Sequence, residues 1–235
     1  MIKIEKLNKK FGKLIVLNQL DLEISSGGVF AILGPNGSGK TTLIKSILGM
    51  VIPNSGNIYY NGESILKKWK YRKNVNYLPQ IANFPANLSV KELISMVKNL
   101  RNEPSNEHHL IELFGLTPFL KQKLGNLSGG TKQKVNIVLT FMFDNELIIL
   151  DEPTTGLDPI ALINLKSLIN QARKEGKTIL ITSHIMSFVE EISDEIVFLL
   201  DGKIYFKGSI NELKTQTNSS SLEIAIANLI KKQYA

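Results

Sequence analysis

Apolar and polar residues alternate along several segments of the N-terminal part of the chain, and this pattern predicts β-strands. The segments IKIEKL (2–7) and LIVLNQLDLEI (14–24) alternate in part, which favours an antiparallel pair with one face against a core. The segment NIYYNGESI (57–65) indicates a further hairpin arm. The apolar run GVFAIL (28–33) ends in glycine and proline, and a helical pattern, KTTLIKSILGM (40–50), follows. A strand, a glycine loop and a helix in this order predict the start of an α/β domain.

The pattern changes after the predicted strand NVNYLPQ (74–80), because the β signals vanish from about 81 to 143. This stretch holds three helical patterns at 90–101, 107–116 and 130–143, separated by the helix breakers Pro85, Pro104 and Pro118. It predicts a helical insert in an otherwise α/β domain.

Strand patterns return in the C-terminal part of the chain. Four apolar segments predict strands, namely ELIIL, KTILIT, EIVFLL and KIYFKG, and helical patterns at 159–176 and 184–193 lie between them. A polar segment, TQTNSSS (215–221), leads to a last amphipathic helix at 222–232.

The length and composition are those of one globular α/β domain with a smaller insert. The chain has 235 residues, of which 43% are hydrophobic and 21% charged. No apolar run reaches the roughly 18 residues that a membrane-spanning helix needs. The first residues lack the apolar core of a signal peptide, and the sequence contains no cysteine, so we expect a cytoplasmic protein.

The net charge of +7 suits nucleic acid, an anionic membrane surface or phosphate ligands, and alone it does not decide between them. The densest basic cluster is KKWKYRK at 67–73, which holds one tryptophan and one tyrosine. Two interpretations of this cluster stay open: a solvated face, or a contact with a partner or membrane surface.

A phosphate-binding loop is predicted at 34–41. Gly34, Gly39, Lys40 and Thr41 match the pattern G-x-x-x-x-G-K-[ST] between a strand and a helix. Glycines allow the backbone N–H groups to wrap around phosphates, and the helix that follows adds its positive end. We expect Lys40 to neutralise phosphate oxygens and Thr41 to bind Mg²⁺ through its hydroxyl. The remaining candidates of this loop are Asn36, Gly37, Ser38 and Thr42.

The segment LIILDEP (147–153) predicts a buried strand that ends in two carboxylates. The carboxyl edge of an α/β sheet is where such folds bind ligands. We expect Asp151 to belong to the Mg²⁺ shell and Glu152 to orient or deprotonate an attacking water. Pro153 favours an extended backbone at Glu152, which would help to aim its side chain.

His184 follows the predicted strand KTILITS. A histidine in this place is able to donate a hydrogen bond to a γ-phosphate or to hold the water-binding carboxylate. A lone histidine at a strand end is also commonly just a polar residue with satisfied hydrogen bonds.

A second glycine-bearing loop, NLSGGTKQK at 126–134, raises the question of why one nucleotide site would need two such loops. Together with the motifs above, it makes the chain resemble the nucleotide-binding subunits of ABC (ATP-binding cassette) transporters from Phe11 to about Gly208. The resemblance identifies LSGGTKQ as the signature, in which Thr131 and Lys132 replace the more usual glutamines.

The resemblance implies roles for further residues. Phe11 takes the place of the aromatic residue, usually a tyrosine, that stacks on adenine, although alone it reads as a core residue. Gln80 matches the glutamine that touches Mg²⁺ and water and senses the membrane partner. Asp158 in GLDP matches the aspartate loop across the dimer, and His184 matches the switch histidine.

The implied fold is α/β, with a P-loop NTPase (RecA-like) core, an antiparallel β subdomain and a helical insert at about 81–143. The implied ATP-binding domain covers 1–216, and 217–235 form a C-terminal linker and helix. ATP and Mg²⁺ are the implied ligands. In the family two subunits pack head to tail, so that Ser128, Gly129 and Gly130 face the γ-phosphate held by the second copy.

The implied partner is an integral membrane transporter subunit, which places the protein on the inner face of the cell membrane. We expect docking around 81–96, where Phe84, Leu88 and Val90 would line a groove. Relatives that act on DNA carry long coiled coils between the two loops, whereas here only 88 positions separate Lys40 from Ser128. No nucleic acid is therefore expected.

Within the family, the segments at 77–94, 127–135 and 182–191 look most like the ATPase of the copper-processing system that supports nitrous-oxide reductase maturation. A drug, lipid or polysaccharide exporter is the alternative. The chain itself shows no ligand pattern suited to copper, so any metal cargo would be handled by partners.

Overall fold

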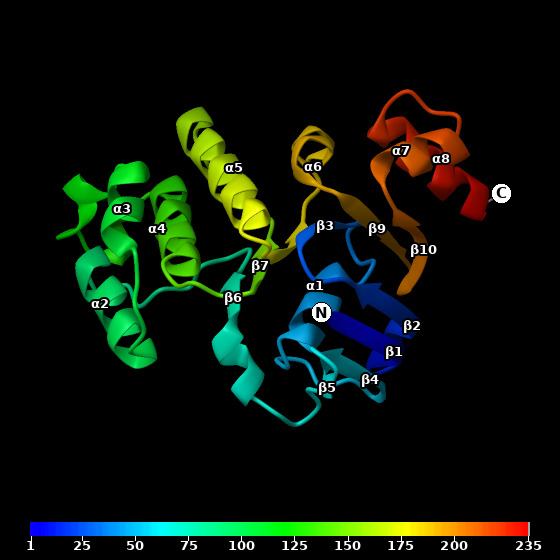
Figure 1. Ribbon diagram of the computed structural model, residues 1–235, viewed down its shortest axis with the longest axis horizontal. Helices are drawn as coiled ribbons and strands as arrows, with labels where there is room; N and C mark the ends of the chain where they lie inside the picture. Colours follow the sequence, from blue (N-terminus) through cyan, green and yellow to red (C-terminus); the bar gives the residue numbers. More distant parts are fainter. Residues whose placement is uncertain (235) are drawn as a thin grey trace.

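The computed structural model describes residues 1–234, and its N-terminal strands form a small antiparallel sheet (Figure 1). The order of its strands is β2-β1-β4-β5. Their bounds are β1 Ile2–Phe11, β2 Leu14–Ile24, β4 Ser55–Tyr60 and β5 Glu63–Ser64. The hairpins predicted from the alternating pattern are therefore present.

The larger sheet has six strands in the order β10-β9-β3-β8-β7-β6, and all neighbours are parallel except β10 and β9. Its strands are β3 Gly28–Leu33, β6 Val75–Leu78, β7 Leu147–Asp151, β8 Thr178–Thr182, β9 Glu195–Leu200 and β10 Lys203–Gly208. Every residue of β7 and β8 is buried, as expected for parallel strands covered on both faces. The α/β core is confirmed.

The register of the parallel strands aligns their carboxyl ends. Thr182 on β8 pairs with Ile32 on β3 at one side and with Asp151 on β7 at the other. Adjacent strands lie about 4.8 Å apart, so Asp151 is roughly 10 Å across the sheet from the end of β3. The loops that leave β3, β7 and β8 therefore start close together at one edge.

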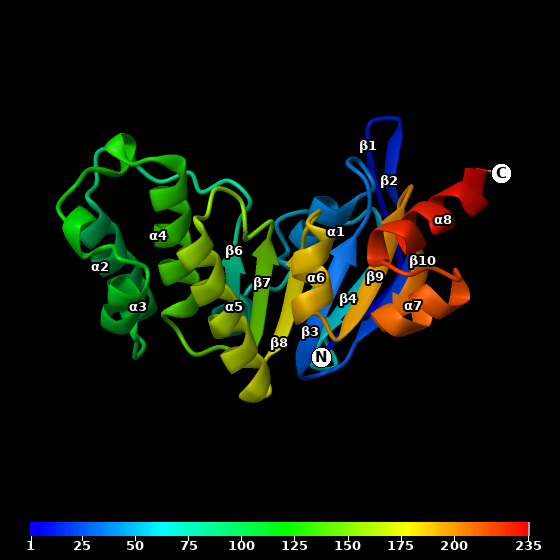
Figure 2. The same cartoon turned by 90° about the horizontal axis from the view of Figure 1, so that it is seen from above.

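Helices cover both faces of the larger sheet (Figures 1 and 2). Helix α1 (Lys40–Ile47) lies in the core between the two sheets, where Leu43 and Ile44 pack with Phe30. Helices α5 (Pro159–Lys174) and α6 (Met186–Ile192) cover the opposite face. Because Val29 and Phe30 are neighbours on a strand, they point to these two different cores.

The insert is helical, as predicted. It contains α2 Val90–Arg101, α3 Glu107–Leu113 and α4 Gly129–Phe141, with short 3₁₀ turns η2 Thr117–Phe119 and η3 Leu124–Asn126. Its apolar residues belong to the same cluster as one face of β7 and β8, so the insert and the sheet share a core. A further 3₁₀ turn, η1 Lys70–Asn74, precedes β6.

The expectation that Val90 lines a docking groove is wrong. Val90 is completely buried at the start of α2, and Phe84 and Leu88 are partly buried against the same core. Residues that follow a helix cap point inward when the first turn packs on a core. The strongly exposed apolar side chain of this segment is that of Ile81, at 70%.

The C-terminal region contains one helix that the pattern did not predict. Helix α7 (Ile210–Gln216) starts at a capping box in which Ser209 and Glu212 exchange hydrogen bonds. Helix α8 (Leu222–Tyr234) follows, and Leu222 packs in a common core with Leu213 and Phe198. Among residues 1–234, no helix is long and apolar enough to cross a membrane.

Candidate functional site

The loop between β3 and α1 has a backbone that only glycine adopts easily. Gly34 has φ +152°, and a Cβ there would lie 2.1 Å from the carbonyl oxygen of Leu199. Gly39, the N-cap of α1, has φ +108°. Side chains at these two positions would clash or strain the loop, so the glycines set its curved shape.

Lys40 closes this loop. Its Nζ donates to the carbonyl oxygens of Gly34, at 2.7 Å, and Pro35, at 3.1 Å. Burial lowers the pKa of Lys40, and the negative charges of Glu152 and Asp151 act in the opposite direction. The ammonium group is thus held near two carboxylates from another strand.

The loop fits a phosphate ligand by two further observations. The Ser38 Oγ is buried and has no hydrogen-bond partner among the described residues. Helix α1 has no acidic residue in its first turn and no side-chain cap, so the N–H groups at its start are not capped by side chains of the helix itself. An anion bound here would accept hydrogen bonds from the Ser38 hydroxyl and from the N–H groups at the start of α1.

The other candidates of the loop are spread along it. Asn36 and Gly37 are exposed at its tip, whereas Thr41 and Thr42 are half-buried in the first turn of α1. Thr41 is therefore not part of the buried core.

The end of β7 forms a hydrogen-bonded group with β8. The buried Asp151 carboxylate accepts from the Thr182 hydroxyl, and the backbone N–H of Glu152 donates to the Thr182 carbonyl oxygen, at 3.1 Å. The His184 Nδ1 lies 2.8 Å from the Glu152 Oε2. Two strand ends thus bring together the two carboxylates and the histidine that the sequence singled out.

The backbone of Glu152 differs from the expectation. Pro153 favours an extended residue before it, but Glu152 has φ +49°, in the left-handed region. Its N–H is fixed by the carbonyl and hydroxyl oxygens of Thr182. The left-handed turn leads the chain off the strand end, at a cost of about 1–3 kcal/mol, and strain of this kind is common at functional sites.

Phe11 and Gln80 lie at the margins of the site. The Phe11 side chain is 50% exposed at the end of β1, and the Lys9 ammonium lies 4.8 Å from its ring centroid. An aromatic ring in this position is not a core residue, and half of its surface is accessible to a ligand. Gln80 is exposed just after β6, beside the strand that carries Asp151.

The signature segment opens α4. Ser128 is the N-cap, and its Oγ accepts from the Thr131 N–H at 3.2 Å. Ser128 and Gly129 are exposed. A Cβ on Gly130 would lie 2.5 Å from the Gly156 carbonyl oxygen, so glycine is required here by the close approach of the segment after β7.

The two glycine-bearing loops do not face each other. Strand β6 lies three strand positions from β3, a separation of roughly 14 Å, and α4 packs on β6. Figures 1 and 2 both show α4 on one side of the larger sheet and α1 between the two sheets. This arrangement agrees with the expectation that one nucleotide does not use both loops of the same chain.

Three polar residues of α4 that sequence reasoning did not single out tie this helix to the site. The buried Gln133 Nε2 donates to the Pro153 carbonyl oxygen, at 3.0 Å, and the buried Asn136 Nδ2 donates to the Pro79 carbonyl oxygen, at 3.1 Å. The Lys134 ammonium lies 2.6 Å from the Asp158 carboxylate. Asp158 in turn caps α5 by accepting from the Ala161 N–H. For Gln133 and Asn136, a polar residue inside an apolar helix pattern was the available signal.

Comparisons with known proteins agree with this geometry. A family model described as "ABC transporter" matches residues 17–155, more than half of the chain. The lantibiotic transport ATP-binding protein SrtF of Streptococcus pyogenes is 35% identical over 234 residues, which cover 98% of this chain and 97% of that protein. The bacitracin transport ATP-binding protein BcrA of Bacillus licheniformis is 33% identical over 232 residues, 97% of this chain and 76% of that protein.

A solved structure of an ATP-binding subunit of an ABC transporter superposes with a TM-score of 0.90 at 28% identity, covering 98% of this chain and 99% of that one. The chain therefore belongs to the ABC transporter family, as an ATP-binding subunit. It is an ATP hydrolase with the nucleotide-binding fold of that family.

Proposed function

We propose that this chain is the ATP-driven motor subunit of an ABC exporter. The proposal rests on one observation: Lys40, Asp151 and the Glu152–His184 pair lie together at the carboxyl ends of the parallel strands, whereas the exposed start of α4 forms no part of this group. The same chain thus carries two separate half-sites: the phosphate loop with its acidic groups, and the exposed start of α4.

The first half-site would hold ATP and Mg²⁺. The backbone N–H groups around Ser38 and Gly39 bind phosphate oxygens, Lys40 neutralises them, and Phe11 stacks on the base. Thr41, Gln80 and Asp151 are the residues that would hold Mg²⁺, which supplies charge neutralisation and positioning of phosphate oxygens.

Hydrolysis would use the Glu152–His184 pair. Glu152 accepts a hydrogen bond from the attacking water and takes its proton, and His184 holds the Glu152 carboxylate in place. The neighbouring Lys40 charge and the Asp151 carboxylate set the local field in which the Glu152 carboxylate acts.

The second half-site would serve a neighbouring copy. Helix α4 has no acidic residue in its first turn, and Ser128, Gly129 and Gly130 present its N-terminal N–H groups. Two copies packed head to tail place each α4 start on the γ-phosphate held by the other copy, and Asp158 lies in the same interface. ATP then joins the subunits, and hydrolysis separates them.

An integral membrane subunit is the proposed partner, which would hold the protein on the inner face of the cell membrane. The relatives named for lantibiotic and bacitracin transport favour an exporter over the copper-processing subgroup, which stays a prediction. Among the described residues, no group of three or more histidine, cysteine, aspartate or glutamate side chains is arranged to hold a metal ion. A copper-related role would therefore depend on the partners.

The test is co-purification of the complex from membranes. Ile81 follows Gln80 and is strongly exposed, so Ile81→Asp should lower the yield of the bound membrane subunit by at least roughly tenfold while ATP binding stays unchanged. Ile163→Asp, at an equally exposed position on α5, is the control and should co-purify normally. Equal yields for both variants would place the docking surface elsewhere.

A further inference from the structure

The basic segment before β6, residues 67–73, presents a cationic surface that the proposed ATP chemistry does not use. It holds five cations and no acidic residue, and Lys67, Lys68, Trp69 and Lys70 are all exposed. Within the described part of the chain, its ion pair joins Lys68 to Glu63 at 3.8 Å, and both side chains are largely in solvent. Such a pair is weak, so the positive charge of the segment remains available.

Trp69 is the single tryptophan of the chain, and 69% of its surface is exposed. A groove of about 590 Å³ runs beside it and is lined by Tyr60, Glu63, Ile65, Lys68 and Tyr71 among others. Tryptophan combines a large apolar ring with one N–H donor and is enriched where an apolar phase meets water. An exposed tryptophan among lysines is the composition of a surface that binds lipid headgroups.

Hydrogen bonds to the end of α1 hold the segment in place. The Tyr71 hydroxyl donates to the carbonyl oxygen of Ile47, and the Arg72 guanidinium donates to that of Gly49, both at 2.8 Å. These bonds fix η1 to the C-terminal end of α1. Residues 67–70 are therefore presented outward from an anchored turn.

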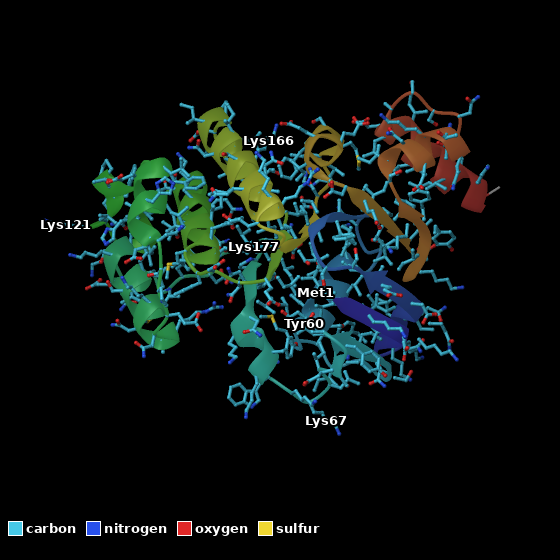
Figure 3. All side chains as sticks on the ribbon, viewed as in Figure 1. Met1, Tyr60, Lys67, Lys121, Lys166 and Lys177 are labelled. Carbon is cyan, nitrogen blue, oxygen red and sulfur yellow. The ribbon has the colours of Figure 1, made fainter. Side chains whose placement is uncertain are left out.

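The location matches the side proposed for the membrane subunit. Figure 1 shows η1, between β5 and β6, on the same lower edge as α2, whereas α5, α6, α7 and α8 lie along the opposite edge. Figure 3 shows Lys67 at the lower edge and Lys166 of α5 at the upper one. A membrane reached by the segment after Gln80 would also be on the side of residues 67–70.

We infer that residues 67–70 bind the anionic headgroups of the membrane surface beside the transporter subunit, with Trp69 inserted at the level of the headgroups. The inference rests on the proposed membrane association. The lysines attract phosphate groups through charge, and the ring gains by leaving water. A single-stranded nucleic acid is the less suitable partner, because successive bases need several aromatic platforms and the segment exposes one.

The experiment uses the full chain with vesicles of phosphatidylcholine alone or mixed with phosphatidylglycerol. The wild-type protein should sediment with the mixed vesicles and not with the neutral ones, less strongly as salt rises. Because Trp69 is the single tryptophan, its emission should move to shorter wavelength on binding. Binding that is equal on both vesicles, or absent, would overturn the inference.

A triple variant tests the residues. Lys67→Gln with Lys68→Gln and Lys70→Gln should weaken binding by on the order of 100-fold, at about fivefold per cation. The control removes three other exposed charges, Lys121→Gln, Lys174→Gln and Lys231→Gln, and should bind nearly as well as the wild type. Equal loss in both variants would show a general charge effect and contradict a specific surface.

Two additional measurements separate the possible failures. The change in Trp69 emission also gives the affinity for a single-stranded oligonucleotide. If this affinity is higher than that for the mixed vesicles at equal salt, the lipid assignment is wrong. ATP binding by the wild type and by both variants is measured without vesicles. A wild-type protein that does not bind ATP would contradict the proposed function, whatever its binding to lipid.

Discussion

The loop after β3 and the start of α4 are both glycine-bearing turns that lead into a helix, but they differ in how much of their chemistry the chain itself completes. Lys40 is half-buried and bonded within its own loop, and the carboxylates of Asp151 and Glu152 act on its pKa. Ser128 and Gly129 are exposed, and no acidic residue lies in the first turn of α4. The difference supports the proposal that the first loop is a nearly complete binding site and that a neighbouring molecule completes the second.

The largest expected effect breaks the first loop. Lys40→Ala removes the cation proposed to face the phosphates and should lower ATP affinity by at least roughly 100-fold, because charge-assisted bonds to phosphate are among the strongest in such sites. Titration calorimetry measures it. Lys45→Ala, on the exposed side of the same helix, is the matched control and should bind normally. Unchanged affinity in Lys40→Ala would sink the assignment of the phosphate loop.

The next effect separates binding from turnover within the same site. His184→Ala removes the partner of the Glu152 carboxylate and should lower the ATPase rate about 10- to 100-fold while ATP binding is kept. The exposed His108 on α3 has no link to the site, so His108→Ala should keep the wild-type rate. If His184→Ala hydrolyses ATP at the wild-type rate, His184 has no role in hydrolysis and is only a polar residue at the end of a strand.

The smallest expected effect concerns the hydrogen bond that connects α4 with the segment after β7. Gln133→Leu keeps the size of the side chain but leaves the Pro153 carbonyl oxygen without its donor, which should lower the free energy of unfolding by about 1–3 kcal/mol. Thermal or urea unfolding measures this change. Gln171→Leu removes a hydrogen bond to Glu175 on the exposed face of α5 and should stay within about 0.5 kcal/mol. Equal stabilities would mean that the bond from α4 to Pro153 contributes little.

Local pattern was sufficient for most of the elements. The predicted segments 14–24, 28–33 and 90–101 coincide with β2, β3 and α2. The first and the last carry the period of their element, and the short apolar run at 28–33 is bounded by turn residues. Helix α7 was missed because it is short and mostly polar, although the Ser209-x-x-Glu212 box marked its start.

Long-range geometry was not available from the sequence. Gln133 and Asn136 donate to carbonyl groups 20 and 57 positions away, and no local pattern encodes such partners. The burial of Val90 follows from packing of the insert, and the left-handed backbone of Glu152 follows from its bonds to Thr182. Motif spacing placed the candidate residues along the chain, whereas the sheet register showed which of them lie together.

If the start of α4 completes the site of a second copy, Glu152→Gln should hold two copies together when ATP is bound. The amide keeps the shape of the carboxylate, so ATP and Mg²⁺ should bind while the rate falls by on the order of 100-fold or more. With ATP, this variant should form dimers by light scattering and remain monomeric with ADP.

Adding Ser128→Arg should abolish that dimer, because a bulky cation on the N-cap would keep the end of α4 from the opposing phosphate. The measurement is the molar mass of Glu152→Gln with ATP, with and without the second substitution. We expect a dimer in the first case and a monomer in the second. A monomer in both cases at high protein concentration would contradict it.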